Sequence, residues 1–126
     1  MDSDKKFATA INCIDGRTQI PVSDWIKEKY AVTYVDMVTE PGCDKIVCGE
    51  DQNIVEKIKS KVLISVNAHK SSLVAVAGHH DCAGNPVTKE EHLEQIKKCV
   101  STIKSWNLPV EAVGLWVNDQ WQIEQI

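Results

Sequence analysis

The stretch LVAVAGHHDC, residues 73–82, places an apolar run directly before a cluster of side chains that can bind metal. Its first five residues are apolar without alternation, which is typical of a strand buried on both faces of a parallel sheet. Its second half contains a His-x-x-Cys pair, His79 and Cys82. Because ligands of such sheets bind at the carboxyl ends of the strands, the stretch predicts a central strand with a candidate site at its end.

Outward from this strand, segments with strand-like and helix-like patterns alternate along the chain. Further strands are expected from their apolar and β-branched content at residues 7–13, 32–38 and 110–117. Helices are expected from apolar spacing, from Pro21 at a first turn and from a capping box at 88–91; they are 21–30, 50–68 and a helix from 88 onward. Residues 39–49 are expected to form a loop, and residues 121–126 a short edge strand that can pair antiparallel.

Strands that alternate with helices predict an α/β fold, a three-layer domain around a mainly parallel sheet. We expect one domain over residues 1–126, with strand order 2-1-3-4 and the short strand at an edge. In this order the first and third strands are neighbours, so Cys13 and His79 lie side by side at their carboxyl ends. The two halves of the candidate site then meet at the crevice where the strand order reverses.

Composition and charge limit the classes of function. The chain has 126 residues, enough to bury one core. Its net charge of −4 with dispersed lysines argues against a nucleic-acid partner, which needs a clustered basic face. No apolar run approaches the length of a membrane span, and residues 1–6 lack the apolar core of a signal peptide. We therefore expect a cytoplasmic protein without a membrane partner, whose five cysteines stay reduced.

A second motif, CIDGR at residues 13–17, contains the only arginine of the sequence. Cys13 together with His79 and Cys82 forms a Cys₂His set, and three protein ligands with an open fourth position are the pattern of catalytic zinc. In a locally extended chain, Cys13, Asp15 and Arg17 point to the same side. We therefore expect a Zn²⁺ cofactor at this site, with Asp15 and Arg17 beside it.

Asp15 has two alternative roles, and the sequence leaves both open. Clamped by Arg17 in a bidentate pair, its carboxylate can accept a hydrogen bond from zinc-bound water. Alternatively, Asp15 binds the zinc as a fourth ligand and closes the site. The choice decides whether water reaches the metal.

The remaining cysteines and histidines receive no role in the site. Cys43 and Cys48 form a C-x₄-C pair that suits a metal or a redox couple, but no third or fourth ligand lies near them in sequence. A plain structural role is therefore favoured for both. Of the other side chains of this kind, we expect Cys99 in the core and Asp81 as a backbone cap in its loop. His80 is expected to be exposed or to form a tautomer-dependent hydrogen bond, and His69 and His92 to lie on helix faces or in loops.

Together, CIDGR and the later stretch AGHHDCAG at residues 77–84 resemble the paired motifs of the β-class carbonic anhydrases. The resemblance extends over residues 7–117, because the expected order of strands and helices also fits that fold. By this resemblance the matching residues have two roles. The implied zinc ligands are Cys13, His79 and Cys82, and the implied dyad next to the metal is Asp15 and Arg17.

The resemblance also implies a reaction and an assembly. The implied reaction is the reversible hydration of carbon dioxide to bicarbonate, in which a zinc-bound hydroxide attacks the carbon and water then displaces bicarbonate. The implied enzyme is thus a carbonate dehydratase, a lyase with a small-molecule substrate. Members of the family associate, so a homodimer or a larger homo-oligomer is expected.

Two features of the sequence depart from the family pattern. Only six residues precede the first strand, where family members generally carry a helical arm that embraces a partner subunit. The loop after the second strand usually contains Asn-Ala-Gly, and here only Gly42 corresponds. Two alternatives therefore stay open beside carbon dioxide hydration. One is hydrolysis of carbonyl sulfide or carbon disulfide on the same fold, and the other is a catalytically silent zinc-binding domain with a sensor or interaction role.

Overall fold

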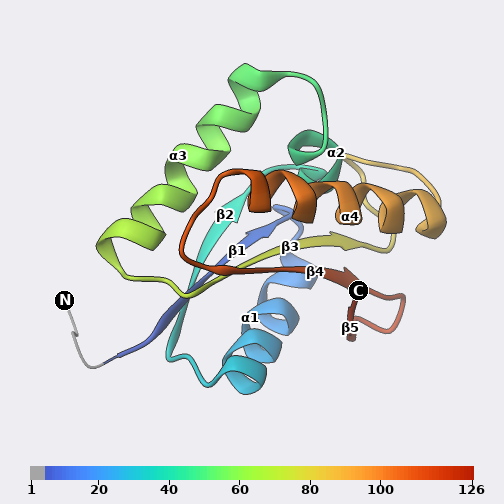
Figure 1. Ribbon diagram of the computed structural model, residues 1–126. Coiled ribbons are helices and arrows are strands. Elements are labelled where there is room, and N and C mark those ends of the chain that lie inside the picture. Colours follow the sequence, from blue (N-terminus) through green and yellow to red (C-terminus); the bar gives the residue numbers. More distant parts are fainter. Residues whose placement is uncertain (1–4) are drawn as a thin grey trace.

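The computed structural model describes residues 5–126, which form a sheet covered by helices on both faces (Figure 1). The strands are β1 (Phe7–Asn12), β2 (Tyr34–Thr39), β3 (Leu73–His79), β4 (Glu111–Val117) and β5 (Ile123–Gln125). The helices are α1 (Gly16–Tyr30), α2 (Cys43–Val47), α3 (Gln52–Ala68) and α4 (Lys89–Ser105). Helix α1 covers one face of the sheet, and α2, α3 and α4 cover the other.

The strand order of the sheet is β2-β1-β3-β4-β5. The first four strands in this order pair in parallel, and β5 pairs antiparallel with β4 at the edge. The predicted three-layer α/β fold, the order 2-1-3-4 and the antiparallel edge strand are therefore confirmed. Because β1 and β3 are neighbours and parallel, their carboxyl ends lie side by side.

Strand β3 lies at the centre of the core, and all seven of its residues are buried. Side chains alternate between the two faces of a strand. Val74 and Val76 pack with the layer of α2, α3 and α4. Leu73, Ala75 and Ala77 pack with α1 on the opposite face. Two apolar layers explain why this run is hydrophobic at every position.

Helix α1 begins at Gly16, earlier than the expected start at Pro21. Asp15 is the N-cap, and its carboxylate accepts a hydrogen bond of 2.9 Å from the backbone N–H of Arg17. Pro21 lies inside the helix, where it removes one backbone hydrogen bond. The expected start was wrong because the cap at Asp15 and the fully buried side chains of Val22 and Ile26 outweigh that loss.

The segment 39–49 contains the short helix α2 and is not the plain loop that its Pro-Gly pair predicts. Gly42 precedes the helix with a φ of 61°, a left-handed conformation that favours glycine. A Cβ on Gly42 would lie 2.7 Å from the carbonyl carbon of Gly84, so two distant backbone segments meet there. Burial of Cys43 and Asp44 in this contact stabilises a helix too short to form alone.

The two long helices lie close to their predicted ranges, but their buried faces differ from the expected stripes. Helix α4 begins after Thr88, whose hydroxyl accepts a hydrogen bond from the N–H of Glu91, as the capping box predicts. In α3, Val55 is buried and Ile54 is exposed. Helix α4 buries His92, Ile96, Cys99 and Ile103, with Leu93 and Val100 only partly buried. The burial of His92 is the most important difference, because a polar side chain occupies a position in the core.

No helix within residues 5–126 is long and apolar enough to cross a membrane. The prediction that no signal peptide is present concerns residues 1–6. Residues 1–4 lie outside the part of the chain that the structure describes.

Candidate metal centre

Two neighbouring strands place the candidate ligands. Cys13 directly follows β1, His79 is the last residue of β3, and Cys82 lies in the loop that follows. One sulfur or nitrogen atom from each of these residues lies within 4.8 Å of the other two, and all three residues are buried. Residues far apart in the sequence are thus brought together at the carboxyl edge of the sheet, as the predicted strand order requires.

The donor atoms fit a tetrahedral zinc ion. The Sγ atoms of Cys13 and Cys82 are 3.9 Å apart. Two zinc–sulfur bonds of about 2.3 Å at a tetrahedral angle separate their sulfurs by about 3.8 Å. The Nδ1 of His79 lies 2.7 Å from the carbonyl oxygen of His80, so Nδ1–H donates and the lone pair is on Nε2. This Nε2 is buried and has no hydrogen-bond partner among the described residues, which a bound cation would supply.

The pKa of the Cys82 thiol is raised to about 11, because the side chain is buried and because the Cys13 sulfur lies beside it. Without metal this thiol is protonated at neutral pH, whereas zinc binds the thiolate. We therefore expect the affinity for zinc to rise about tenfold per pH unit between pH 6 and 8 from this one proton. Competition with a chelator of known proton dependence measures the slope, and release of protons into weak buffer is an independent check. An affinity that does not change with pH would contradict the expectation.

Asp15 and Arg17 form the expected bidentate pair beside the cluster. The Nη2 of Arg17 lies 2.7 Å from Oδ2 of Asp15, and Nε lies 3.1 Å from Oδ1. These hydrogen bonds lower the pKa of Asp15 to about 2. The carboxylate is therefore ionised throughout the physiological range, and both of its oxygens accept from Arg17.

Asp81 contacts the same guanidinium and does not act as the backbone cap that was expected. Its Oδ2 lies 3.2 Å from Nη1 of Arg17, and its carbonyl oxygen lies 3.1 Å from Nη2. The backbone of Asp81 has a φ of 58°, which turns the chain between His79 and Cys82. Arg17 thereby joins the first turn of α1 to the loop that carries Cys82.

Trp121 is a residue of the site that sequence reasoning missed. The guanidinium carbon of Arg17 lies 4.5 Å from the centre of the Trp121 ring, a cation–π contact. The same ring is 6.4 Å from the ring of His79. Trp121 has a φ of 59° in the turn between β4 and β5, where Asn118 Oδ1 accepts from the N–H groups of Gln120 and Gln122. The sequence places Trp121 only at the start of the expected edge strand, and nothing in it indicates where the ring points.

The other polar side chains lie outside the cluster. Within residues 5–126, no further group of three or more metal-ligating residues comes together, and the structural role of Cys43 and Cys48 stays a prediction. Cys99 is buried in the core, and His80 is exposed, both as predicted. His92 is not on a solvated helix face; it is buried against Asp44.

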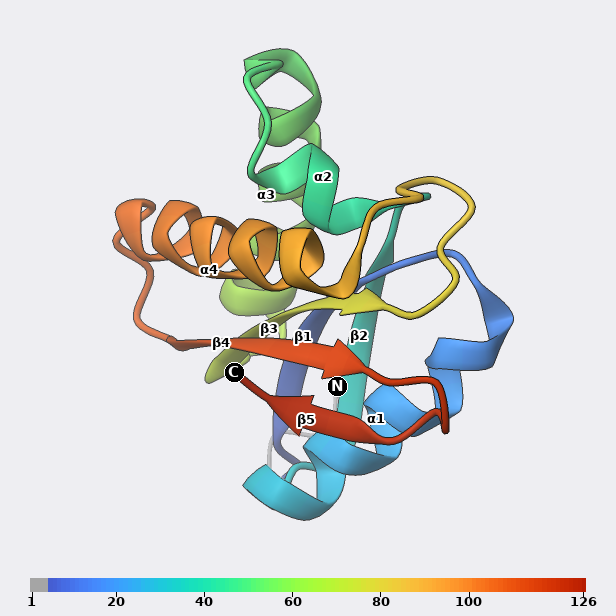
Figure 2. The same cartoon turned by 90° about the vertical axis from the view of Figure 1, so that its right-hand side faces the viewer.

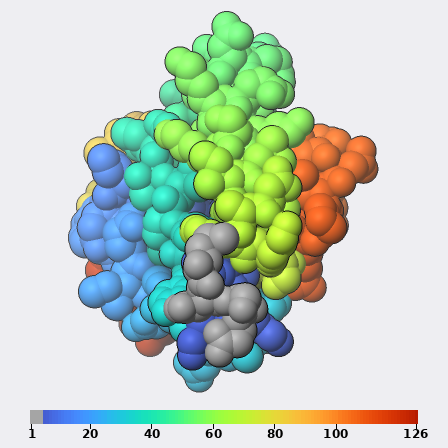
Figure 3. Space-filling view, turned by 90° about the vertical axis from the view of Figure 1, so that its left-hand side faces the viewer, coloured from blue at the N-terminus to red at the C-terminus, as the bar shows by residue number. Residues whose placement is uncertain are grey.

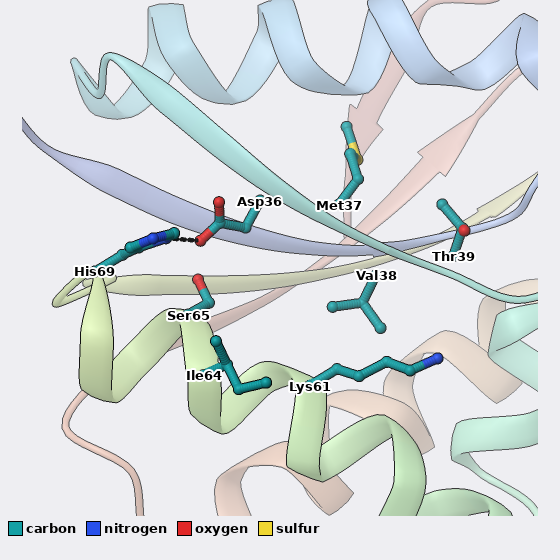
Figure 4. Close-up of a pocket in the computed structure, with 8 residues that line it drawn as sticks. All are labelled: Asp36, Met37, Val38, Thr39, Lys61, Ile64, Ser65 and His69. Atoms are coloured by element: carbon teal, nitrogen blue, oxygen red, sulfur yellow. Dashed lines mark hydrogen bonds and ion pairs between the residues drawn. The ribbon is translucent and has the colours of Figure 1, made fainter. Parts of the chain in front are cut away.

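A pocket of about 340 Å³ between β2 and α3 is separate from this site. Figure 4 shows His69 and Asp36 pointing toward each other at one end of it, with 2.6 Å between Nδ1 and Oδ2. Figure 3 shows α3 running along the surface of this side of the molecule. None of the predicted site residues lines the pocket.

The chain is similar to known proteins in family and in fold. A family model described as "Putative carbonic anhydrase" matches residues 3–126. Among solved structures, the chain is similar to a tetrameric β-carbonic anhydrase of Sordaria macrospora, with 13% identity, a TM-score of 0.55, and coverage of 97% of this chain and 80% of that chain. It is also similar to the β-carbonic anhydrase CafD of Aspergillus fumigatus, with 12% identity, a TM-score of 0.54, and coverage of 99% and 91%.

No curated protein matches the chain by sequence. At these low identities the solved structures establish the shared fold. The family model, which extends over nearly the whole chain, establishes the relationship. The chain therefore belongs to the carbonic anhydrase family described by this model.

Proposed function

We propose that this protein is a zinc-dependent carbonic anhydrase that catalyses the reversible hydration of carbon dioxide to bicarbonate. In this proposal residues 1–126 are one zinc domain, and Cys13, His79 and Cys82 hold the metal. The observation that carries the proposal is the buried cluster of two sulfurs and an unpartnered imidazole nitrogen, within 4.8 Å of one another. Zinc held by such a set lowers the pKa of bound water to about 7 and so supplies a nucleophile at neutral pH.

The residues of the chain have distinct tasks in this reaction. His79 is fixed in one tautomer by its hydrogen bond to the carbonyl of His80, which presents Nε2 to the metal. Asp15 is an ionised acceptor whose task is to orient the attacking water by a hydrogen bond. Arg17 performs no proton transfer; it holds Asp15 in place. Because both oxygens of Asp15 accept from Arg17, we favour the open arrangement, in which Asp15 does not bind the metal.

The experiment that tests the proposal combines metal analysis with kinetics on the full chain. We expect one zinc per chain and carbon dioxide hydration in a stopped-flow assay between pH 6.5 and 9. Zinc without hydration across this range would favour the silent zinc-binding domain. Zinc with hydrolysis of carbonyl sulfide or carbon disulfide, but no hydration of carbon dioxide, would favour the other alternative. A chain that binds no zinc would overturn the proposal.

Assembly and location belong to the same proposal. We propose a homodimer or larger homo-oligomer, because the relative from Sordaria macrospora is tetrameric and because Ile14 and Ile20, near the candidate site, are 64% and 71% exposed. Sedimentation equilibrium measures the mass in solution. A cytoplasmic location stays a prediction, and the five free cysteines are consistent with a reducing compartment.

A further inference from the structure

A network of buried polar side chains lies behind the candidate metal centre, and the proposed reaction does not use it. Asp44 of α2, Asn85 of the loop after β3 and His92 of α4 are each at most 2% exposed. The Nδ1 of His92 lies 2.5 Å from Oδ2 of Asp44, and the Nδ2 of Asn85 lies 2.9 Å from Oδ1 of Asp44. One carboxylate thus joins two helices to the loop that carries Cys82.

Asn85 connects this network to the candidate ligand Cys82. Its backbone N–H donates to the carbonyl of Cys82 at 3.3 Å, and its carbonyl accepts from the N–H of Val87 at 2.9 Å. Its side-chain amide also donates to Oε1 of Gln95 at 2.7 Å. The loop is therefore held at Asn85 from both its backbone and its side chain, three residues after the sulfur.

Asp44 and its neighbour also contact the strand that ends at His79. A Cβ on Gly78 would lie 2.5 Å from Oδ2 of Asp44, so only glycine allows this carboxylate to approach. The Sγ–H of Cys43 donates to the carbonyl of Ala77 at 3.1 Å. Helix α2 therefore packs against the strand end that carries His79 and, through Asn85, against the loop that carries Cys82. Figure 2 shows this loop running past the end of β2, beside α2, to the start of α4.

Burying this polar network costs desolvation free energy that an apolar core in the same place would not cost. A buried carboxylate is unfavourable unless its oxygens are partnered, and a well-packed apolar pair often stabilises a core as much. Here Oδ1 of Asp44 accepts from the N–H of Lys45 and from Asn85, and Oδ2 contacts His92. Hydrogen bonds are directional, so they fix the position of the loop more narrowly than apolar contacts do.

We propose that Asp44, Asn85 and His92 are positioning residues of the metal centre, which hold the segments of His79 and Cys82 at the separation that the metal needs. This inference rests on the proposed function, because it requires that the cluster binds metal. It adds residues that neither touch the metal nor belong to the two motifs. Side chains that hydrogen-bond to metal ligands typically change metal affinity or activity 10- to 100-fold when they are removed, and Asp44, Asn85 and His92 act on the ligands through the backbone of the loop and the strand.

The test measures binding of Zn²⁺ and Co²⁺ to the full chain with Asn85→Ala, Asn85→Ser and Asp44→Ala. We expect each variant to bind Co²⁺ about 10- to 100-fold more weakly than the wild type, with a shifted visible spectrum of the bound Co²⁺. Asp44→Asn keeps the shape of the side chain and an acceptor for Asn85, so its affinity should lie closer to the wild-type value. Asn85→Ser is the milder variant if Asn85→Ala does not fold.

The matched control is Ser65→Ala, which breaks a different buried network. Ser65 Oγ lies 2.6 Å from Oγ1 of Thr9, in a contact between α3 and β1 that does not include the metal loop. This control should lower the unfolding temperature and leave Co²⁺ affinity and spectrum unchanged. Folded Asn85 and Asp44 variants with wild-type affinity and spectrum would overturn the inference alone. A wild-type chain that binds neither metal would overturn the proposed function and the inference together.

Discussion

Cys82→Ser is expected to abolish stoichiometric zinc binding and to lower the rate of carbon dioxide hydration at least about 1,000-fold. A serine hydroxyl is not deprotonated near neutral pH and is a poor zinc ligand, so only Cys13 and His79 remain as donors. Two donors leave the metal weakly held, and the low pKa of its bound water is lost with it. Zinc content after desalting and stopped-flow hydration measure the two effects.

Cys48→Ser is the matched control for this variant. It makes the same chemical change at a partly exposed cysteine outside the cluster, and it should retain one zinc and the wild-type rate. Thermal unfolding supplies a readout that does not depend on turnover. Free zinc at 1,000 times its dissociation constant should stabilise the wild type by about 4 kcal/mol and leave Cys82→Ser unchanged. A Cys82→Ser protein that keeps zinc and full activity would contradict the ligand assignment.

Asp15→Asn is expected to keep the zinc and to lower kcat/KM about 100- to 10,000-fold. The amide has nearly the same shape as the carboxylate, but it is a weaker acceptor for the proton of the attacking water, and it loses the charge that pairs with Arg17. Because the pKa of Asp15 is about 2, the loss should be constant between pH 6.5 and 9, where the wild-type residue is always ionised. Stopped-flow kinetics with parallel zinc analysis measure both quantities.

Asp81→Asn provides a control at the second carboxylate that contacts Arg17. Its Oδ2 lies 3.2 Å from the guanidinium and its side chain is 70% exposed, so its removal should cost less than about tenfold. Equal losses for the two variants would mean that Asp15 acts only as a partner of Arg17. Loss of zinc from Asp15→Asn would instead support the closed arrangement, in which Asp15 is itself a ligand.

Much of the fold follows from local patterns, because an apolar run or a helix cap involves only a few neighbouring residues. The run at Leu73–His79, the cap at Thr88 and the edge strand all lie where the sequence predicts them. The errors arose where long-range packing overrides a local marker. Pro21 indicates a helix start but lies inside α1, and the Pro-Gly pair before Cys43 indicates a loop but precedes α2.

The sequence by itself determined the α/β fold and the set of Cys13, His79 and Cys82. Strand ends and the spacing of these residues depend on short stretches of sequence, so both can be recognised locally. Only the tertiary structure decided what surrounds that set. Asp44 meets Asn85 and His92 across 41 and 48 residues, and Arg17 meets Asp81 across 64. Such contacts depend on how helices and loops pack, and a single sequence carries no local signal for them. The cluster of Cys13, His79 and Cys82 could therefore be predicted from the chain, and the side chains that surround it could not.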